Sequence, residues 1–403
     1  MPGALPEGLS WSDDFVLRPL VNDDKTFHAY VHIPFCTVRC GYCDFNTYAP
    51  KETTADQSRF DQSLVTEIQN SNRYLTEVEI KLPGISSVFF GGGTPSLFSP
   101  SQFRSILHSL RDEFGLLPGA EITTEANPES TTPEFLEQLR ELGVTRLSLG
   151  VQSFDEKVLR VLDRAHTEQK VFDLVPRAIE LGFDVSIDLI YGAPGESMAS
   201  WQRTLEKAIS LGTNHISAYS LIVETGTALE RKIRRGELSE VDEDLNAAKH
   251  ELADQVISSA GLQWYEVSNW GKPSVHNSAY WSGQNWWGYG PGAHSHISGH
   301  RFWNLKHPTA YSKQLESGLA IAGREELSQR QMLEEELMLG LRTQKGVRRD
   351  LFSDLGAKPQ KVASAIGEGL LGLTKDRVVV MPKGRLLVDR LVVDFLSDSE
   401  EIV

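Results

Sequence analysis

Three cysteines lie close together near the start of the chain, and they are its only cysteines. Cys36, Cys40 and Cys43 follow the spacing Cys-x3-Cys-x2-Cys. Three thiolates can bind three irons of a [4Fe–4S] cluster and leave the fourth iron without a protein ligand. Such an iron can bind a substrate or a cofactor, so the run predicts a cluster that takes part in chemistry.

Clustered cysteines have two other common uses. A disulfide framework is not indicated, because three is an odd number and the chain is long. Structural zinc takes four ligands, often as paired Cys-x2-Cys units, and the chain has a single such unit, Cys40 and Cys43. His32 and Asp44 could complete a zinc site, so zinc stays open as the alternative to a cluster.

The cysteine run resembles the signature of the radical S-adenosylmethionine (SAM) superfamily, Cys-x3-Cys-x-aromatic-Cys, with Tyr42 as the aromatic residue. In that superfamily the open iron binds the amino and carboxylate groups of SAM, and an electron from the cluster releases a 5′-deoxyadenosyl radical. The resemblance implies that the three cysteines hold a [4Fe–4S] cluster, that Tyr42 lies near the adenine, and that a donor such as a flavodoxin or a ferredoxin supplies the electron. The wider phrase from Tyr30 to Cys36 is similar to the branch that contains oxygen-independent coproporphyrinogen III oxidase.

Strands and helices must position these residues. From residue 28 onward, runs with the apolar spacing of strands alternate with runs that have the apolar spacing of helices. Six runs have the pattern of strands, namely 28–33, 87–90, 121–125, 146–151, 184–190 and 215–220. Amphipathic stretches lie between them, namely 61–75, 100–114, 132–142, 169–181 and 200–211. The alternation predicts an α/β fold with a parallel sheet covered by helices, and the resemblance implies a partial (β/α)6 TIM-like barrel. A complete eight-unit barrel or a doubly wound sheet would alternate in the same way.

Residues suited to a cofactor follow the predicted strands at their carboxyl ends, where parallel barrels carry their active sites. The three glycines at 91–93 let the backbone approach a ligand and expose its amides. Carboxylates such as Glu125 and Asp188 can accept hydrogen bonds from ribose hydroxyls or an amino group, and Arg164 can pair with a carboxylate. Judged by residue type alone, these side chains could instead form structural hydrogen bonds or ion pairs inside the barrel mouth. With the resemblance, the predicted SAM-binding set is Tyr30, Tyr42, Gly92, Gly93, Thr94, Glu125, Gln152, Arg164 and Asp188.

Aromatic residues are concentrated after the predicted barrel. Six of the eight tryptophans lie there, namely Trp264, Trp270, Trp281, Trp286, Trp287 and Trp303. Glycines and prolines predict a loop-rich segment, whose rings must be buried against something. A packed cap over the barrel mouth and a site for a flat apolar ligand, with an imidazole available to iron, both fit this composition.

A motif in this segment, His276-Asn277-x-x-Tyr280-Trp281, resembles that of the heme chaperones in the same branch, which bind heme and pass it to acceptor proteins. The resemblance implies that His276 contacts heme, and a structural hydrogen-bonding role is the alternative. Coproporphyrinogen dehydrogenases of this branch have a fourth cysteine two residues after the third, where this chain has Phe45. Phe45 and the histidine motif favour a heme chaperone over a dehydrogenase that decarboxylates coproporphyrinogen III.

The chain changes character near residue 327. A helix is predicted over 329–341, and 378–388 has the pattern of a β-hairpin with a Pro-Lys-Gly turn. These elements predict a small α+β winged-helix-like domain, like the C-terminal domain of the coproporphyrinogen oxidase branch. The predicted organisation is an N-terminal extension (1–27), the radical SAM barrel (28–262), an aromatic-rich connecting segment (263–326), the C-terminal domain (327–396) and a tail (397–403).

Charge and hydropathy limit the function classes. A net charge of −15 argues against a nucleic-acid binder, because phosphate contacts need a basic surface. No apolar run approaches the roughly 20 residues that span a bilayer, and the first residues lack the features of a secretory signal. Together with reduced cysteines, these features predict a cytoplasmic protein. The resemblance implies heme as cargo and heme-accepting proteins as partners, membrane-associated acceptors among them.

Overall fold

Six parallel strands follow one another in chain order through the centre of a sheet that has twelve strands within the described residues. The computed structural model describes residues 8–11, 15–18 and 25–397. The six strands are β1 (Phe27–Ile33), β2 (Ile85–Gly92), β3 (Leu116–Ala126), β4 (Arg146–Gln152), β5 (Asp184–Tyr191) and β6 (His215–Ser220). Each pairs in parallel with the next. The partial (β/α)6 barrel is confirmed, since a doubly wound sheet would reverse its strand order and a complete barrel would add two more units.

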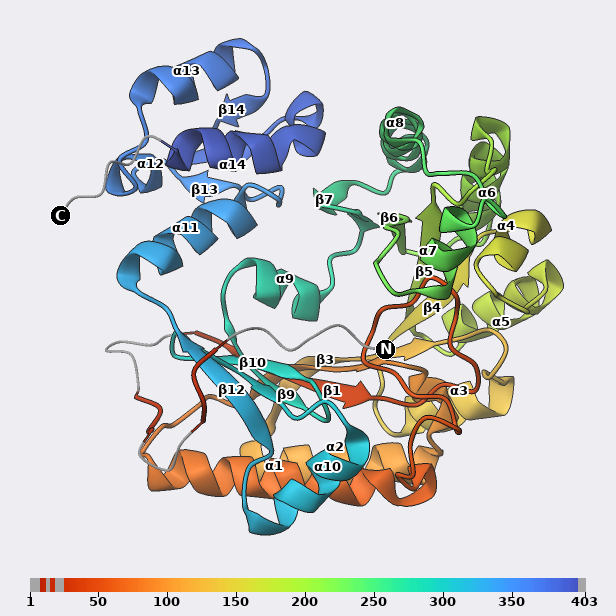
Figure 1. The fold of residues 1–403 in the computed structure, drawn as a ribbon, viewed down its shortest axis with the longest axis vertical. Helices are drawn as coiled ribbons and strands as arrows, with labels where there is room; N and C mark the ends of the chain where they lie inside the picture. Colours follow the sequence, from red (N-terminus) through yellow and green to blue (C-terminus); the bar gives the residue numbers. More distant parts are fainter. Residues whose placement is uncertain (1–7, 12–14, 19–24, 398–403) are drawn as a thin grey trace.

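Helices cover the outer face of these strands (Figure 1). They are α1 (Phe60–Glu77), α2 (Pro100–Phe114), α3 (Pro133–Glu141), α4 (Glu156–Val161), α5 (Glu168–Glu180) and α6 (Met198–Ser210). Their starts are encoded locally: Ser99 and Gln102 form a capping box at α2, which satisfies amides that the first helical turn leaves unpaired. Apolar residues then join helix to sheet, as where Phe90 of β2 packs on Phe103 of α2 with ring centroids 4.8 Å apart.

Side chains along the central strands alternate between two environments, as the two-residue period of a strand requires. The apolar set, such as Val31 and Ile187, joins the core under the helices. The alternate set is strongly polar and faces the inner side of the curved sheet, which we call the lumen. It includes His28, Ser87, Glu121, Glu125, Arg146, Asp188 and His215. A polar lumen inside an apolar shell suits a ligand-binding barrel.

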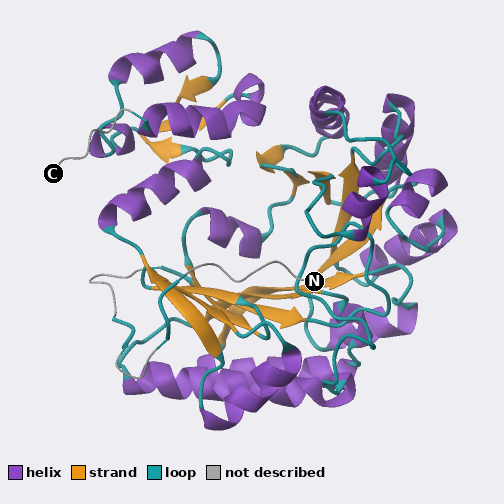
Figure 2. Cartoon of the chain, in the orientation of Figure 1, coloured by secondary structure: helices purple, strands orange, loops and turns teal. Residues whose placement is uncertain are grey.

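Both edges of the parallel series are extended by strands from the aromatic-rich segment (Figure 2). On one side β9 (Asn285–Tyr289) pairs in parallel with β1, followed by antiparallel β10 (His294–Ile297), β11 (His300–Asn304) and β12 (Ile321–Glu326). On the other side β8 (Asn269–Gly271) and β7 (Trp264–Glu266) continue from β6. The prediction of a loop-rich segment is therefore wrong. Its glycines and prolines lie largely in the tight turns between short strands, and rings such as Trp287 and Tyr289 are fully buried in the sheet.

Three more helices complete this part of the chain, α7 (Ala228–Arg234), α8 (Glu243–Ser259) and α10 (Pro308–Gln314). Another, α9 (Val275–Trp281), lies on the lumen side, between the sheet and the C-terminal helices (Figure 1). The histidine motif therefore forms a helix of its own, placed between the barrel and the rest of the chain.

A small C-terminal domain with an antiparallel sheet is confirmed. Helices α11 (Gln329–Gly340), α12 (Leu351–Asp354), α13 (Pro359–Gly367) and α14 (Val388–Leu396) accompany β13 (Val347–Arg348), β14 (Leu371–Leu373) and β15 (Arg377–Val380). The hairpin predicted over 378–388 is wrong, because β15 pairs with the preceding β14 and the chain after it turns helical at Pro382. Proline suits the first position of a helix, and Val388, Leu391, Val392 and Phe395 recur at helical spacing on a buried face.

The ends of the chain are only partly described. The predicted tail lies outside the described residues except for residue 397, and so does most of the predicted N-terminal extension. Its described residue Trp11 packs against Tyr74 and Phe302. Within the described chain, no helix combines the length and apolar character needed to cross a bilayer.

Candidate cofactor-binding site

The three cysteines lie on the loop that leaves the carboxyl end of β1. All three thiols are free and partly exposed, which removes the disulfide alternative. Burial raises the pKa of the Cys36 thiol, and it raises the pKa of Cys43 to about 11. Thiols in such a setting become thiolates only beside a compensating positive charge. The donor set of this loop therefore fits iron, and Cys36, Cys40 and Cys43 are the residues that would hold it.

Distant parts of the chain hold this loop in place. Asn46 donates hydrogen bonds from Nδ2 to the carbonyls of Pro291 (2.9 Å) and Lys306 (3.0 Å). The Tyr48 hydroxyl donates to the same Lys306 carbonyl over 3.2 Å. Gly292 has a φ of +72°, and a Cβ there would lie 2.6 Å from Asn46 Nδ2. A glycine is thus required beside the loop, for its conformation and for space.

The glycine turn after β2 lies directly against the cysteine loop. Gly93 donates its backbone amide to Ile33 O, and Thr94 donates its amide to Phe35 O, both over 2.8 Å. A Cβ on Gly93 would lie 2.5 Å from Phe35 O, so no larger residue fits. Thr94 Oγ1 also donates to Cys36 Sγ over 3.7 Å. The structure therefore brings the predicted Gly92, Gly93 and Thr94 together with the cysteines.

Glu125 lies on the lumen side of this turn. Its carboxylate accepts the backbone amide of Gly92 over 3.0 Å. Burial, with a smaller contribution from the charge of Asp188, raises the pKa of Glu125 to about 8. A cationic group bound beside Glu125 would restore the ionised form, because opposite charge stabilises a carboxylate. This carboxyl group therefore fits the amino group of SAM.

Asp188 is held by three serines that the sequence analysis did not single out. Its carboxylate accepts hydrogen bonds from Ser148 (2.7 Å), Ser217 (2.8 Å) and Ser186 (3.0 Å), which come from three neighbouring strands. Burial raises its pKa. The serines have no distinctive spacing in the sequence, and only strand alternation could have placed them on the lumen face.

Arg164 and Gln152 lie at the carboxyl end of β4. Arg164 donates from Nη2 to Asn127 Oδ1 and to the carbonyl of Gly150, both over 2.9 Å, while its buried Nε has no partner among the described residues. Asn127 in turn donates to Thr94 Oγ1 over 3.1 Å, which links Arg164 to the cysteine loop. Gln152 has a φ of +65°, a left-handed conformation uncommon for this residue type. The Arg164 guanidinium is also paired with Glu129 over 3.2 Å, so Nε is the nitrogen that is left for an anionic ligand group.

The two predicted tyrosines, Tyr30 on β1 and Tyr42 within the cysteine loop, have different surroundings. Tyr42 packs against an apolar cluster that includes Ile190 and Leu229. The Tyr30 hydroxyl bonds to His32 Nδ1 over 3.0 Å, and His32 Nε2 donates to the carbonyl of Asn46 over 2.9 Å. Burial lowers the pKa of His32 to about 4.

These contacts leave zinc without support. Both ring nitrogens of His32, a candidate zinc ligand, are already occupied by hydrogen bonds. Among the residues that the structure describes, the three cysteines included, no three His, Cys, Asp or Glu side chains are arranged as a site for a metal ion. The hydrogen bonds of His32 argue against that residue as the fourth ligand of a tetrahedral zinc site.

His276 is fully buried in the lumen. Its Nδ1 bonds to Ser87 Oγ and its Nε2 to the Tyr280 hydroxyl, each over 2.8 Å. Burial holds its pKa well below the ordinary value. Nδ1 joins α9 to β2 and Nε2 is used within α9, so an axial bond to iron would require one of the two nitrogens to change partner.

A buried ion pair that the sequence analysis missed supports the start of α9. Glu121 accepts hydrogen bonds from the amides of Val275 (2.9 Å) and His276 (3.2 Å), and it pairs with Arg146 over 2.9 Å. Arg146 also donates to the carbonyl of Pro273 over 3.0 Å. Glu121 lies within β3 and Arg146 begins β4, both far from α9 in the sequence, so only the three-dimensional arrangement brings them to the helix.

Comparisons with known proteins agree with this geometry. The radical SAM superfamily model matches residues 30–208, and the HemN C-terminal domain model matches residues 327–387. Heme chaperone HemW of Mycobacterium tuberculosis (strain CDC 1551 / Oshkosh) is 44% identical over 375 residues, covering 91% of this chain and 94% of the relative. Heme chaperone HemW of Bacillus subtilis (strain 168) is 32% identical, covering 92% and 99%.

A solved structure shares the same fold. The coproporphyrinogen III oxidase HemN of Escherichia coli, described as a radical SAM enzyme, superposes with a TM-score of 0.79 at 25% identity, covering 93% of this chain and 90% of that one. This match extends over both domains of the chain. The two relatives, at 44% and 32% identity, also extend over both. The chain therefore belongs to the heme chaperone HemW family within the radical SAM superfamily.

Proposed function

We propose that the chain binds heme and delivers it to acceptor hemoproteins, and that it carries a SAM-chelated [4Fe–4S] cluster. The observation that carries the proposal is Phe45, which occupies the position of the fourth cysteine of coproporphyrinogen dehydrogenases and is 60% exposed. An exposed phenyl ring has no acid–base or redox chemistry to replace a thiol. The names of the relatives at 44% and 32% identity support the same reading.

The residues of the strand ends would hold the two resident cofactors. Cys36, Cys40 and Cys43 would bind the cluster, which supplies one-electron chemistry when it is present. The SAM-binding residues would be Tyr30, Tyr42, Gly92, Gly93, Thr94, Glu125, Gln152, Arg164 and Asp188. Within this set, the carboxyl group of Glu125 would face the ammonium group of SAM, which would stabilise its ionised form. The guanidinium of Arg164, whose Nε has no partner among the described residues, would face the carboxylate of SAM.

The second candidate function is that of an oxygen-independent coproporphyrinogen III dehydrogenase, which decarboxylates propionates in porphyrin biosynthesis. The structural match to E. coli HemN, which extends over both domains, is the observation in its favour. Shared fold does not fix activity, and the missing fourth cysteine weighs against this reaction.

The expected partners follow from the proposed role. They are heme, heme-accepting proteins that include membrane-associated ones, and an electron donor such as a flavodoxin or a ferredoxin. We infer a cytoplasmic location from the reduced cysteines, and the acidic net charge of −15 disfavours nucleic acid.

One anaerobic experiment separates the two functions. After reconstitution of the cluster, heme binding and turnover of coproporphyrinogen III are measured on the same preparation. The chaperone proposal expects stoichiometric heme binding without protoporphyrinogen formation, and efficient turnover without heme binding would refute it. Cys40→Ala should abolish the iron–sulfur chromophore, whereas a normal spectrum would remove Cys40 from the cluster. Unchanged heme affinity in His276→Ala would remove that residue from the predicted heme contact.

A further inference from the structure

A series of hydrogen bonds runs inward from β7 to Asp188, the carboxylate that the proposed function places at SAM. The Tyr265 hydroxyl lies 2.9 Å from His215 Nε2, and His215 Nδ1 lies 2.7 Å from Ser186 Oγ. Ser186 Oγ in turn lies 3.0 Å from Asp188 Oδ1. Tyr265, His215 and Ser186 are all buried, so these bonds are shielded from solvent. We call the four residues Tyr265, His215, Ser186 and Asp188 the Asp188 network.

The carboxylate at the inner end fixes the direction of every bond in the Asp188 network. An ionised carboxylate can only accept, so Ser186 donates its one hydrogen to Asp188 and accepts at its oxygen from His215. Ser217 uses its own hydrogen on the same carboxylate oxygen, over 2.8 Å, and its Oγ lies 3.3 Å from that of Ser186. The imidazole proton is therefore on Nδ1, and Nε2 carries the lone pair that accepts from the Tyr265 hydroxyl.

The outer end of the network has the same direction. The backbone amide of Ser274 can only donate, and it donates to the Tyr265 hydroxyl oxygen over 3.3 Å. That oxygen accepts from the amide and keeps its hydrogen for His215. Burial lowers the pKa of His215 to about 3, so the ring is neutral and has a single proton to place.

The two oxygens of Asp188 differ in how many donors they have. Oδ1 accepts from Ser186 and Ser217, whereas Oδ2 accepts from Ser148 alone among the described residues. A carboxylate oxygen has about two acceptor sites, so Oδ1 is filled and Oδ2 retains one site. Oδ2 is therefore the oxygen that remains for a hydroxyl or amino group of a ligand.

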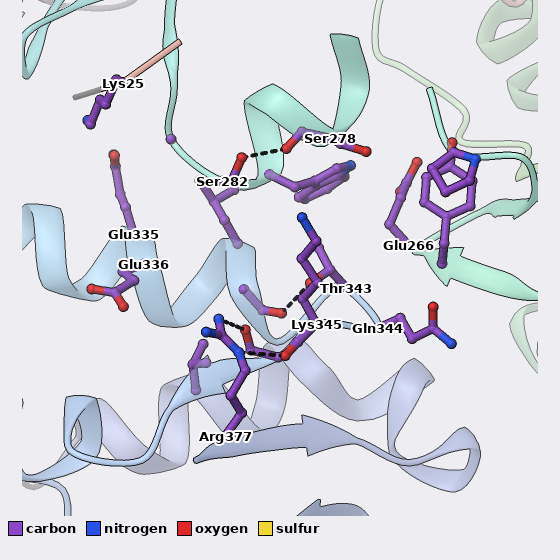
Figure 3. Close-up of a pocket in the computed structure, with 18 of the residues that line it drawn as sticks. Lys25, Glu266, Ser278, Ser282, Glu335, Glu336, Thr343, Gln344, Lys345 and Arg377 are labelled. Atoms are coloured by element: carbon purple, nitrogen blue, oxygen red, sulfur yellow. Dashed lines mark hydrogen bonds between the residues drawn. The ribbon is translucent and has the colours of Figure 1, made fainter. Parts of the chain in front are cut away.

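Contacts with the C-terminal domain hold Tyr265 in place. The amide of Gln344 donates to the Tyr265 carbonyl over 2.8 Å, and the neighbouring Glu266 forms an antiparallel bridge with Thr343. Figure 3 shows Glu266, Thr343 and Gln344 at a cleft of about 610 Å³ between α9 and the C-terminal domain, which Tyr265 also lines. The network thus begins at a contact between domains and ends at the predicted SAM site.

We infer that His215 and Tyr265 are positioning residues for SAM binding, which hold the Ser186 hydroxyl turned toward Asp188 so that its carboxylate keeps all its donors and presents Oδ2 to the ligand. The inference rests on the proposed function and adds to it two residues that act through another. Hydrogen bonds to the charged form of a carboxyl group favour that form. With the imidazole proton on Nε2 instead, the Ser186 hydrogen would turn to Nδ1, and Asp188 would lose a donor.

Nitrogen NMR of the full chain, isotope-labelled at histidine and carrying its reconstituted, oxidised cluster, tests the position of the imidazole proton. The shifts of the two ring nitrogens distinguish the protonated one from the unprotonated one, and the signals that disappear in His215→Asn belong to His215. We expect the proton on Nδ1 at neutral pH. A proton on Nε2 would overturn the inference, whatever the binding measurements show.

Anaerobic calorimetry of SAM binding to the same oxidised chain tests the role of the network. We expect His215→Leu and Tyr265→Phe each to weaken SAM binding about tenfold, the loss that one hydrogen bond to a charged group represents. His215→Asn should keep most of the affinity, because its amide nitrogen stands as many bonds from the backbone as Nδ1 and can donate to Ser186. Tyr289→Phe is the matched control, since Tyr289 is also buried but its hydroxyl contacts Ser71 of α1.

The outcomes distinguish the inference from the function on which it rests. If the unmodified chain binds no SAM, that part of the proposed function fails and the inference fails with it. If the unmodified chain binds SAM and folded Tyr265→Phe and His215→Leu bind it equally well, only the positioning role is overturned. Equal weakening in His215→Leu and His215→Asn would likewise overturn it, because the loss would not follow the Nδ1 donor. An unchanged cluster spectrum and circular dichroism show that each variant is folded.

Discussion

Thr94 donates a hydrogen bond from Oγ1 to the sulfur of Cys36 over 3.7 Å and so joins the glycine turn to the cysteine loop. Hydrogen bonds to the sulfurs of an iron–sulfur cluster help to set its reduction potential, because they stabilise the more negative reduced state. Thr94→Val keeps the shape of the side chain and removes the donor. We expect a more negative cluster potential at unchanged iron content, measured by a redox titration followed by electron paramagnetic resonance.

Thr204→Val is the control for this experiment, since Thr204 is equally buried but bonds to Ser153 on another strand end. Equal potentials in the Thr94 variant and the unmodified chain, at equal iron content, would contradict the prediction.

The raised pKa of Glu125 makes stability depend on pH. The carboxyl group ionises near pH 4.5 when unfolded and at about 8 when folded, so the cofactor-free fold loses stability as the pH rises between these values. Glu125→Gln removes this penalty and should stabilise the cofactor-free chain by about 1–3 kcal/mol at pH 8.5, with little effect near pH 4.5. The same change should weaken SAM binding. Urea unfolding at pH 5, 7 and 8.5 measures the first effect, and a pH-independent difference would disprove the titration argument.

Three buried histidines should make the fold sensitive to acid. Burial lowers the pKa of His28 and His32 to about 4 each and that of His215 to about 3, so all three are neutral in the folded chain. The unfolded chain protonates them near pH 6.5, and stability is therefore full above pH 6.5 and falls as the pH drops toward 4. His215→Gln should reduce the slope of the unfolding free energy against pH by up to one proton, measured by urea unfolding at several pH values below about 6.5.

A buried ion pair stabilises the loop after β5. Lys249 Nζ lies 2.9 Å from Glu196 Oε2, with the two side chains 1% and 0% exposed, and Glu196 also accepts the amide of Gly192 over 2.7 Å. Lys249→Met leaves a buried carboxylate without its cation and should cost about 3–5 kcal/mol of unfolding free energy. Adding Glu196→Gln should recover part of this loss, and a double variant no more stable than the single one would argue against charge burial as the cause.

The sequence was sufficient to predict the parallel core. Each central strand alternates lumen-facing polar residues with helix-facing apolar ones, and chemistry-bearing groups such as Thr94 and Glu125 stand at the strand ends, so local pattern and global fold agree there. The hydrogen bonds of Asp188 to three serines were not predictable, because serine on a strand carries no signal until its neighbours are known.

Elsewhere, tertiary contacts overrode local signals. β9 pairs in parallel with β1 although more than 250 residues separate the two strands, and no local pattern encodes such pairing. The Pro-Lys-Gly stretch at 382–384 has the composition of a turn but begins a helical segment, since the apolar residues after it pack against α11 and α13. Sequence-based prediction therefore failed where a segment's partner was far away or belonged to another element.

The contacts of Asn46 with Pro291 and Lys306 have a consequence for synthesis of the chain. The cysteine loop is translated early, but the carbonyls that fix it emerge from the ribosome about 250 residues later. At about 5–20 residues per second, the nascent loop waits roughly 12–50 s before its supports exist. Assembly of the iron–sulfur cluster on a completed scaffold is consequently a post-translational event, and a chain that terminates before residue 291 carries all three cysteines without the framework that holds them.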